Sequence, residues 1–182
     1  KQIPFDTALD TCCGTGAGMR MLHPLAGKQV VGIDFSEEML SQARQLLADS
    51  DGEASLDFVH GDVLEMDFHE QFDIVPCFGA LGHITSKDTA SFLARIHSAL
   101  KPGGAFVFIT SYPPPLLSPA FWISHSFNLA MRIRNFIMYY LTFLLPGIQQ
   151  TLEANGFRVE IRSAAELGQF RVVFATKVNS NI

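Results

Sequence analysis

Short, uninterrupted apolar runs recur along the chain, and segments with apolar residues three and four apart separate them. An uninterrupted run is typical of a parallel strand covered on both faces, whereas the three-and-four spacing is typical of an amphipathic helix. Regular alternation of the two predicts an α/β fold with a doubly wound, mostly parallel sheet. The predicted strands are 3–9, 29–33, 56–59, 72–78 and 105–110, and the helices between them start within 14–22, after Ser36, and after Thr85 or Ser86.

The C-terminal part departs from this alternation. A helix is predicted over 146–154, and the dipeptide Asn155-Gly156 ends it. Two strand-like runs, 157–163 and 169–177, then follow with a connection too short for a crossover helix, so they should pair antiparallel. We therefore predict one domain over 1–182, a mostly parallel sheet with a C-terminal antiparallel hairpin strand. Because strand-like sequence begins within a few residues of Lys1, we also expect an N-terminal segment to be missing.

Composition and charge narrow the classes of function. Hydrophobic residues make up 48% and charged residues 17% of the chain, which is typical of a folded globular domain. The net charge of -5 provides no basic field for binding nucleic acid. Two of the three cysteines, Cys12 and Cys13, are adjacent and would point to opposite faces of a strand. We therefore expect no disulfide framework and a cytoplasmic location, and we predict no metal site.

The stretch LDTCCGTGAG at 9–18 joins a predicted strand to a predicted helix through a glycine-rich loop. Such a loop brings bare backbone N–H groups and a helix N-terminus close to a ligand. Asp34 ends the next predicted strand, 20 positions after Gly14, where a carboxylate can accept both hydroxyls of a ribose. Dinucleotides and S-adenosylmethionine are the two ligand classes bound in this way.

Two residues favour S-adenosylmethionine over a dinucleotide. The dinucleotide fingerprint G-x-G-x-x-G would need its third glycine at position 19, which is Met19. The Asp10 carboxylate would repel a pyrophosphate, but it would attract the ammonium group of a methionine moiety. The loop therefore predicts a nucleoside that carries methionine.

Five segments resemble, in order and spacing, the motifs of the class I S-adenosylmethionine-dependent methyltransferases. The resemblance covers nearly the whole chain, and the family also ends in an antiparallel hairpin strand. Cys12 departs from the pattern, because the family usually has glycine at that position. The five segments are ALDTCCGTGAG, VVGIDFSEEML, HGDVLEMDF, FDIVPCFGALGHI and LKPGGAFVFIT.

The resemblance implies a cofactor site at particular positions of this sequence. Asp34 would bind the ribose, Asp62 would accept a hydrogen bond from the adenine amino group, and Cys77 would lie near the sulfonium. The residues implied for the methionine end are Asp10, Cys12, Cys13, Gly14 and Gly16. The residues implied for the rest of the cofactor are Asp34, Phe35, Met39, Asp62, Val63, Cys77 and Phe78, with core packing as the alternative for Phe35 and Met39.

The acceptor side is predicted from His83 and from the segment 112–145. His83 lies just past the fourth predicted strand and is a candidate general base, with a packing role as the alternative. The segment is rich in aromatic residues and carries only Arg132 and Arg134 as formal charges. Its apolar stretch after Arg134 is shorter than the roughly 20 residues that a membrane-spanning helix needs. We interpret it as an apolar lid over the acceptor, with candidate substrate-binding residues Trp122, Tyr139 and Tyr140.

The motifs and the resemblance together predict an enzyme that transfers a methyl group from S-adenosylmethionine to a small, partly apolar molecule. The alternatives are a nicotinamide-dependent oxidoreductase on a similar sheet and a non-catalytic cofactor-binding domain. We expect no nucleic-acid partner and no transmembrane segment. A homodimer interface and peripheral membrane contact stay open as alternative uses of the segment 112–145.

Overall fold

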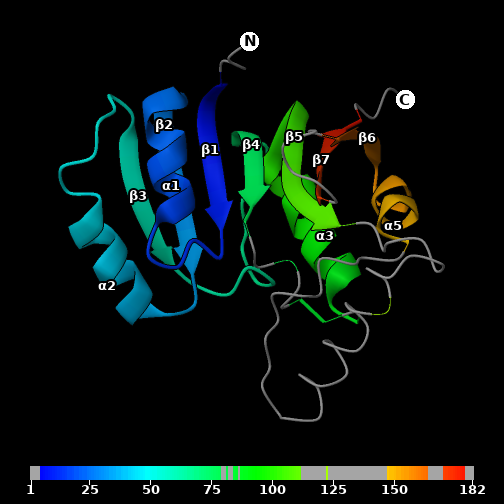
Figure 1. Ribbon diagram of the computed structural model, residues 1–182, viewed down its shortest axis with the longest axis horizontal. Coiled ribbons are helices and arrows are strands. Elements are labelled where there is room, and N and C mark those ends of the chain that lie inside the picture. The colour runs from blue at the N-terminus through cyan, green and yellow to red at the C-terminus, as the bar shows by residue number, and fades with distance from the viewer. Residues whose placement is uncertain are drawn as a thin grey trace.

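The computed structural model describes residues 5–78, 81, 84–85, 87–111, 122, 147–163 and 170–178. The described strands form a seven-stranded sheet in the order β3-β2-β1-β4-β5-β7-β6 (Figure 1). The strands are β1 (Phe5–Thr11), β2 (Ala26–Asp34), β3 (Ser55–His60), β4 (Phe72–Cys77), β5 (Leu100–Ser111), β6 (Phe157–Ser163) and β7 (Phe170–Lys177). The helices are α1 (Ala17–Leu22), the short 3₁₀ helix η1 (His23–Leu25), α2 (Glu37–Leu46), α3 (Thr89–Ala99) and α5 (Ile148–Ala154).

Strand pairing confirms the predicted fold class. The strands β1 to β5 pair in parallel, with β1 between β2 and β4. The strand β7 pairs antiparallel with both β5 and β6, as the short connection between the last two strands predicts. The chain therefore has a doubly wound α/β sheet that ends in an antiparallel hairpin.

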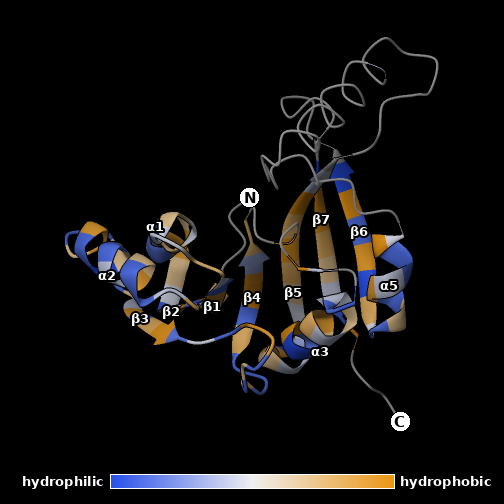
Figure 2. Cartoon of the chain, turned by 90° about the horizontal axis from the view of Figure 1, so that it is seen from below, coloured by the Kyte–Doolittle hydropathy of each residue, from blue (hydrophilic) through white to orange (hydrophobic). Residues whose placement is uncertain are grey.

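Each face of the sheet has its own hydrophobic core, because successive residues of a strand point to opposite faces. Ala8 and Val30 belong to the core under α1 and α2, whereas their neighbours Leu9 and Val31 belong to the core under α3. Figure 2 shows α1 and α2 on one side of the sheet and α3 on the other. The α3 side has a largely aromatic core, whose fully buried rings are Phe72, Phe92, Phe106 and Phe108.

Several element boundaries differ from the prediction, and three of the differences concern β1, α3 and β5. The strand β1 continues to Thr11, two residues beyond the predicted end. The helix α3 begins at Thr89 with Asp88 as its N-cap residue, because Thr85 first forms a separate turn in which its carbonyl accepts from the Asp88 N–H. The predicted connector KPGG is part of β5 instead. Gly103 there has a φ of +78°, and the pairing of β5 with β4 is irregular along this stretch.

The remaining predictions on caps and domain organisation have different outcomes. Ser36 caps α2 as predicted, since its side chain accepts a hydrogen bond from the Met39 N–H. Ser86 lies outside the described residues, as does the segment 112–145 apart from Trp122, so the lid and the single domain over 1–182 stay predictions. Within the described part of the chain, no helix is long and apolar enough to cross a membrane.

A polar network joins β1, β4 and β5 near the start of each strand. The Asp73 carboxylate accepts hydrogen bonds from the backbone N–H groups of Asp6 and Thr7, at 3.0 and 2.8 Å, and from Lys101 Nζ at 2.8 Å. Burial alone would raise the pKa of Asp73, but the hydrogen bonds from Lys101 and Thr7 outweigh it and hold the pKa below its usual value. The Asp73 carboxylate at this edge of the sheet therefore has its hydrogen bonds made.

We expect Asp73→Asn to lower the free energy of unfolding by about 1 kcal/mol at pH 7. Because the pKa of Asp73 is lower in the folded state, the ionised carboxylate stabilises the fold above about pH 4, and this contribution is lost as the pH falls further. Urea unfolding of both proteins at pH 7 and below pH 4 measures the effect. The matched control is Asp6→Asn at the same edge, which should change stability much less; equal effects of the two variants would contradict a special role for Asp73.

Candidate functional site

The carboxyl ends of β1, β2, β3 and β4 lie at one edge of the sheet, where ligands of open parallel sheets usually bind (Figure 1). The glycine-rich loop follows β1, and the turn into α2 follows β2. The segment 61–71 follows β3 and continues to β4 without a helix. The implied cofactor residues come from these connections and from the strand ends beside them.

The glycine-rich loop bends sharply as it leaves β1. Cys12, Gly14 and Gly16 all have left-handed backbone conformations, with φ of +55°, +53° and +83°. A side chain at Gly16 would collide with Leu47, because its Cβ would lie 2.7 Å from Leu47 Cδ1, whereas a Cβ at Gly14 would meet no atom within 4 Å. Gly16 therefore allows α1 and α2 to pack closely, and Gly14 borders open space.

Asp34 joins the loop to the end of β2. Its Oδ2 accepts a hydrogen bond from the Gly14 N–H at 2.8 Å, and its Oδ1 accepts one from the Ser36 N–H at 2.9 Å. The residue is only 6% exposed. A carboxylate has about four lone-pair positions, so two remain that could accept ligand hydroxyls. Asp34 thus holds the loop in place and could still accept hydrogen bonds from two ribose hydroxyls, as its predicted role requires.

The Asp10 side chain lies beneath the first turn of α1. The Met19 N–H donates a hydrogen bond to its carboxylate, while Oδ2 has no hydrogen-bond partner among the described residues. Gly18 makes this position accessible, because a Cβ there would lie 2.4 Å from Asp10 Oδ2. Burial, against the lowering effect of the Met19 hydrogen bond and with a smaller contribution from the nearby charge of Asp34, raises the pKa of Asp10 to about 7. An ammonium group that reached this carboxylate would offset the cost of its burial.

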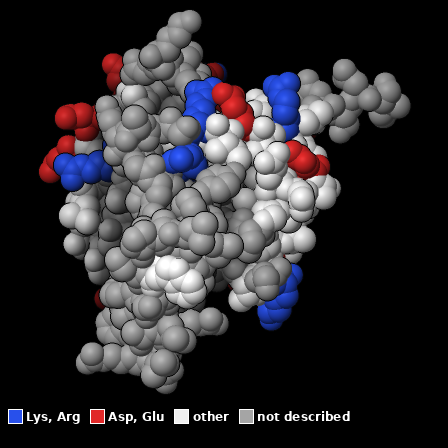
Figure 3. All heavy atoms as spheres, turned by 45° about the vertical axis from the view of Figure 1, so that its right-hand side comes forward, with Lys and Arg blue, Asp and Glu red and all other residues white. Residues whose placement is uncertain are grey.

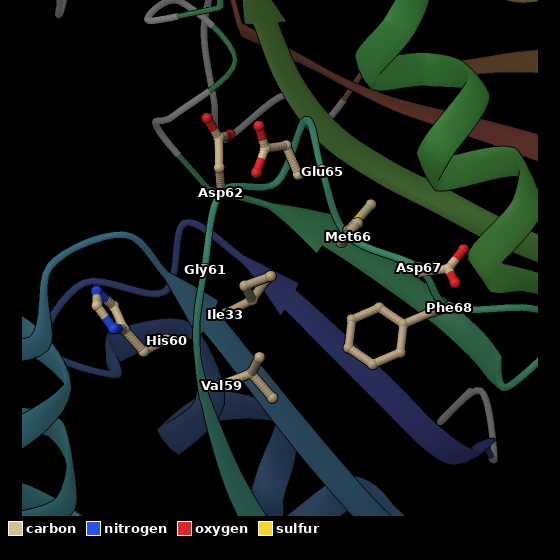
Figure 4. Close-up of a pocket in the computed structure, with 9 residues that line it drawn as sticks. All are labelled: Ile33, Val59, His60, Gly61, Asp62, Glu65, Met66, Asp67 and Phe68. Atoms are coloured by element: carbon tan, nitrogen blue, oxygen red, sulfur yellow. The ribbon is translucent and has the colours of Figure 1, made fainter.

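The segment after β3 lines a cavity of about 280 Å³ (Figure 4). Asp62 lies at its rim, and the Asp62 Oδ1 accepts a hydrogen bond from the Leu64 N–H at 2.8 Å. Val63 is buried in the core on the α3 side, so only its backbone could contact a ligand. The apolar part of the lining consists of Ile33, Val59, Met66 and Phe68.

Two apolar side chains beside Asp34 are exposed. Phe35, which directly follows β2, is 77% exposed, and Met39 in the first turn of α2 is 41% exposed. Exposed large apolar groups that border a polar site are typical of ligand-binding surfaces. The core-packing alternative for these two residues therefore does not describe the structure.

The thiols of Cys12 and Cys13 stay protonated at neutral pH, so they are not activated as nucleophiles. Burial is the main cause that raises the pKa of Cys12 far above its ordinary value and that of Cys13 to about 12. Cys77 is a buried member of the core at the end of β4, and Phe78 after it is partly exposed. Their implied place near the sulfonium stays a prediction.

The acceptor-side predictions are mostly untested. His83, Tyr139 and Tyr140 lie outside the described residues. Trp122 is described alone and is 64% exposed. In the part of the chain that the structure describes, no group of three or more His, Cys, Asp or Glu side chains could hold a metal ion.

Two residues at this edge were not singled out by the sequence. Gly18 is needed for the buried position of Asp10, and its place in the same glycine-rich stretch was the available signal. His60 ends β3, and its Nε2 lies 2.9 Å from the carbonyl oxygen of Phe35. No local pattern predicts that contact, because it joins residues from two different strand ends.

Comparison with known proteins points to one family. The sequence matches the methyltransferase-domain family over residues 8–104. A demethylmenaquinone methyltransferase of Oceanobacillus iheyensis is 36% identical over 115 residues, which are 62% of this chain and 47% of that protein. The chain thus spans about half the length of the curated relatives that it matches.

Solved structures share the fold. An O-methyltransferase family protein of Burkholderia thailandensis has a TM-score of 0.72 at 18% identity, covering 97% of this chain and 52% of that one. Phosphoethanolamine N-methyltransferase 2 of Haemonchus contortus, solved with S-adenosyl-L-methionine, has a TM-score of 0.69 at 20% identity, covering 98% of this chain and 50% of that one. Likeness at these identities shows the fold alone.

We expect Asp10→Asn to make the fold more stable than the wild type above pH 7, by on the order of 2–4 kcal/mol. The folded pKa of about 7 exceeds the unfolded value near 4. The stabilisation by protonated Asp10 is therefore complete below about pH 4 and is lost as the pH rises through 7. Urea unfolding of the wild type and of Asp10→Asn from pH 4 to 8 measures the difference in their free energies of unfolding. Asp57→Asn, at an exposed carboxylate on β3, is the control, and parallel pH profiles for wild type and Asp10→Asn would refute the prediction.

We expect Asp34→Ala to weaken S-adenosylmethionine binding at least about tenfold, since it removes charge-assisted hydrogen bonds worth roughly 1.5–3 kcal/mol each. Calorimetric titration, with circular dichroism to confirm folding, measures the change. Asp57→Ala should bind as the wild type does. A folded Asp34→Ala protein with unchanged affinity would mean that the ribose binds elsewhere.

Proposed function

The chain belongs to the methyltransferase-domain family, and on that basis we propose that it transfers a methyl group from S-adenosylmethionine to a small, apolar acceptor of the quinone class. The observation that carries the proposal is the 2.8 Å hydrogen bond from the Gly14 N–H to the Asp34 carboxylate. It brings the glycine-rich loop and the acid proposed to bind the ribose together at one point of the sheet edge. That arrangement suits a nucleoside ligand.

The residues at the edge fit this cofactor from one end to the other. The Asp10 Oδ2, which has no hydrogen-bond partner within the described part of the chain, would face a positive charge, and Asp34 would accept the ribose hydroxyls. The exposed ring of Phe35 would lie against the adenine, with Asp62 accepting from its amino group. A dinucleotide would instead bring a pyrophosphate close to Asp10, so the nicotinamide-dependent alternative is not favoured.

The chemistry follows from positioning. When bound, S-adenosylmethionine supplies an electrophilic methyl group on a sulfonium. The residues of this chain would hold the cofactor so that the methyl group faces the acceptor beyond the end of β4, near Cys77 and Phe78, and would keep water away from it. His83 is the candidate base that would take a proton from the acceptor.

The acceptor class is supported by relatives named demethylmenaquinone methyltransferases and by the apolar composition of 112–145. In this proposal the segment covers the acceptor, with Trp122, Tyr139 and Tyr140 contacting it. A homodimer interface in the same segment stays an alternative use. We also propose a cytoplasmic location, which the odd number of cysteines in the chain, three, supports.

The proposal is tested in two steps. Calorimetry should detect binding of S-adenosylmethionine and S-adenosylhomocysteine at micromolar levels, with no response to NAD. Incubation with radiolabelled S-adenosylmethionine and a reduced, short-chain demethylated naphthoquinone should then give a labelled product whose mass has increased by one methylene unit. Asp34→Ala serves as the inactive control. Binding of NAD alone would overturn the cofactor assignment, and cofactor binding without quinone methylation would overturn the acceptor class.

A further inference from the structure

We propose that His60 is a positioning residue for the adenosine end of the cofactor, because its imidazole holds the backbone of Phe35 in place. The proposal rests on the proposed function and assigns a further role at the same site. His60 would act through the turn between β2 and α2 rather than by touching the reacting atoms.

Backbone pairing brings His60 to this position. His60 is the register partner of Asp34 in the parallel β2–β3 ladder, and the Gly61 N–H donates to the Asp34 carbonyl at 3.0 Å. The end of β3 is therefore fixed beside the acid predicted to bind the ribose. Figure 4 shows the His60 ring on the other side of β3 from the Val59 side chain.

The imidazole contacts the turn through one of its nitrogens, and the other faces the first turn of α2. Nε2 lies 2.9 Å from the Phe35 carbonyl oxygen, and since a carbonyl only accepts, Nε2 must carry the proton. Nδ1 lies 4.0 Å from Glu37 Oε2 in the first turn of α2, and the other oxygen of Glu37 accepts from Arg44 Nη1 at 2.7 Å. The ring is thus bonded to the turn through Nε2, with Nδ1 close to the start of α2.

The hydrogen bond from His60 matters because packing does not hold the Phe35 side chain, which the turn presents to the ligand. Phe35 is 77% exposed, and only Phe35 and Ser36 connect β2 to α2. A ring that lies against an adenine loses affinity when its backbone moves, since each freely moving side chain must be ordered again on binding. The hydrogen bond from His60 removes part of that cost in advance.

The test compares a variant that loses the donor with one that keeps it. His60→Leu removes the N–H and retains apolar bulk, whereas His60→Gln places an amide N–H near the position of Nε2. His69→Leu is the matched control, because His69 is also an exposed histidine beside a carboxylate, Asp67, at 3.0 Å, but it precedes β4 and lies away from the carboxyl ends of the strands.

We expect His60→Leu to raise the dissociation constants of S-adenosylmethionine and S-adenosylhomocysteine about five- to tenfold, or roughly 1–1.4 kcal/mol. The kcat at saturating cofactor and the KM of the acceptor should stay within about twofold of wild type. His60→Gln and His69→Leu should bind the cofactor nearly as the wild type does. A protein whose fold was merely destabilised would not lose cofactor affinity while keeping kcat and the acceptor KM, and glutamine would not restore that affinity.

Three results would overturn the inference: unchanged cofactor affinity in His60→Leu, equal loss in His60→Gln, or equal loss in His69→Leu. These are distinct from failure of the proposed function, in which the wild type itself binds neither methionine nucleoside.

Discussion

The hydrogen bond between the Gly14 N–H and the Asp34 carboxylate is the contact on which the candidate site depends. Parallel pairing places Thr11 beside Ile33, so the residues that follow the two strands emerge side by side. The loop must turn back at once for its amides to meet the carboxylate, and the left-handed conformations at positions 12, 14 and 16 provide that turn. The loop would lose one of its anchors without Asp34, and Asp34 would have an unsatisfied buried oxygen without the loop.

The edge of the sheet at the strand starts and the edge at the carboxyl ends differ in how fully their buried polar groups are hydrogen-bonded. At the edge with Asp73, the carboxylate is bonded to two backbone N–H groups and to Lys101. At the opposite edge, Asp10 is 2% exposed, and one of its oxygens has no partner among the residues that the structure describes. Cys12 there adopts a conformation that costs a non-glycine residue on the order of 1 kcal/mol. Such local costs gather where a protein binds ligands, because a bound molecule can offset them.

In the proposed function, each strand end at the carboxyl edge holds a different part of the S-adenosylmethionine molecule. The end of β1 offers the glycine loop and Asp10, the end of β2 offers Asp34 and Phe35, and the segment after β3 offers Asp62 beside a cavity. His60 connects the last two, since it ends one strand and is bonded to the residue that follows the other. In the proposed function the end of β4 is left for the acceptor. Such a division would let one methyltransferase domain keep its cofactor site while the acceptor side varies.

The sequence by itself determined the elements and their order. Uninterrupted apolar runs predicted parallel strands covered on both faces, Ser36 predicted the start of α2, and the short gap before the last strand predicted antiparallel pairing. The glycine loop and Asp34 also followed from sequence, because their spacing reflects one strand–helix–strand unit. Only the tertiary structure decided that Asp10 lies buried under α1, that KPGG joins β5 as an irregular stretch, and that His60 reaches Phe35. These features depend on contacts between residues far apart in the chain, which local patterns of apolar and polar residues do not record.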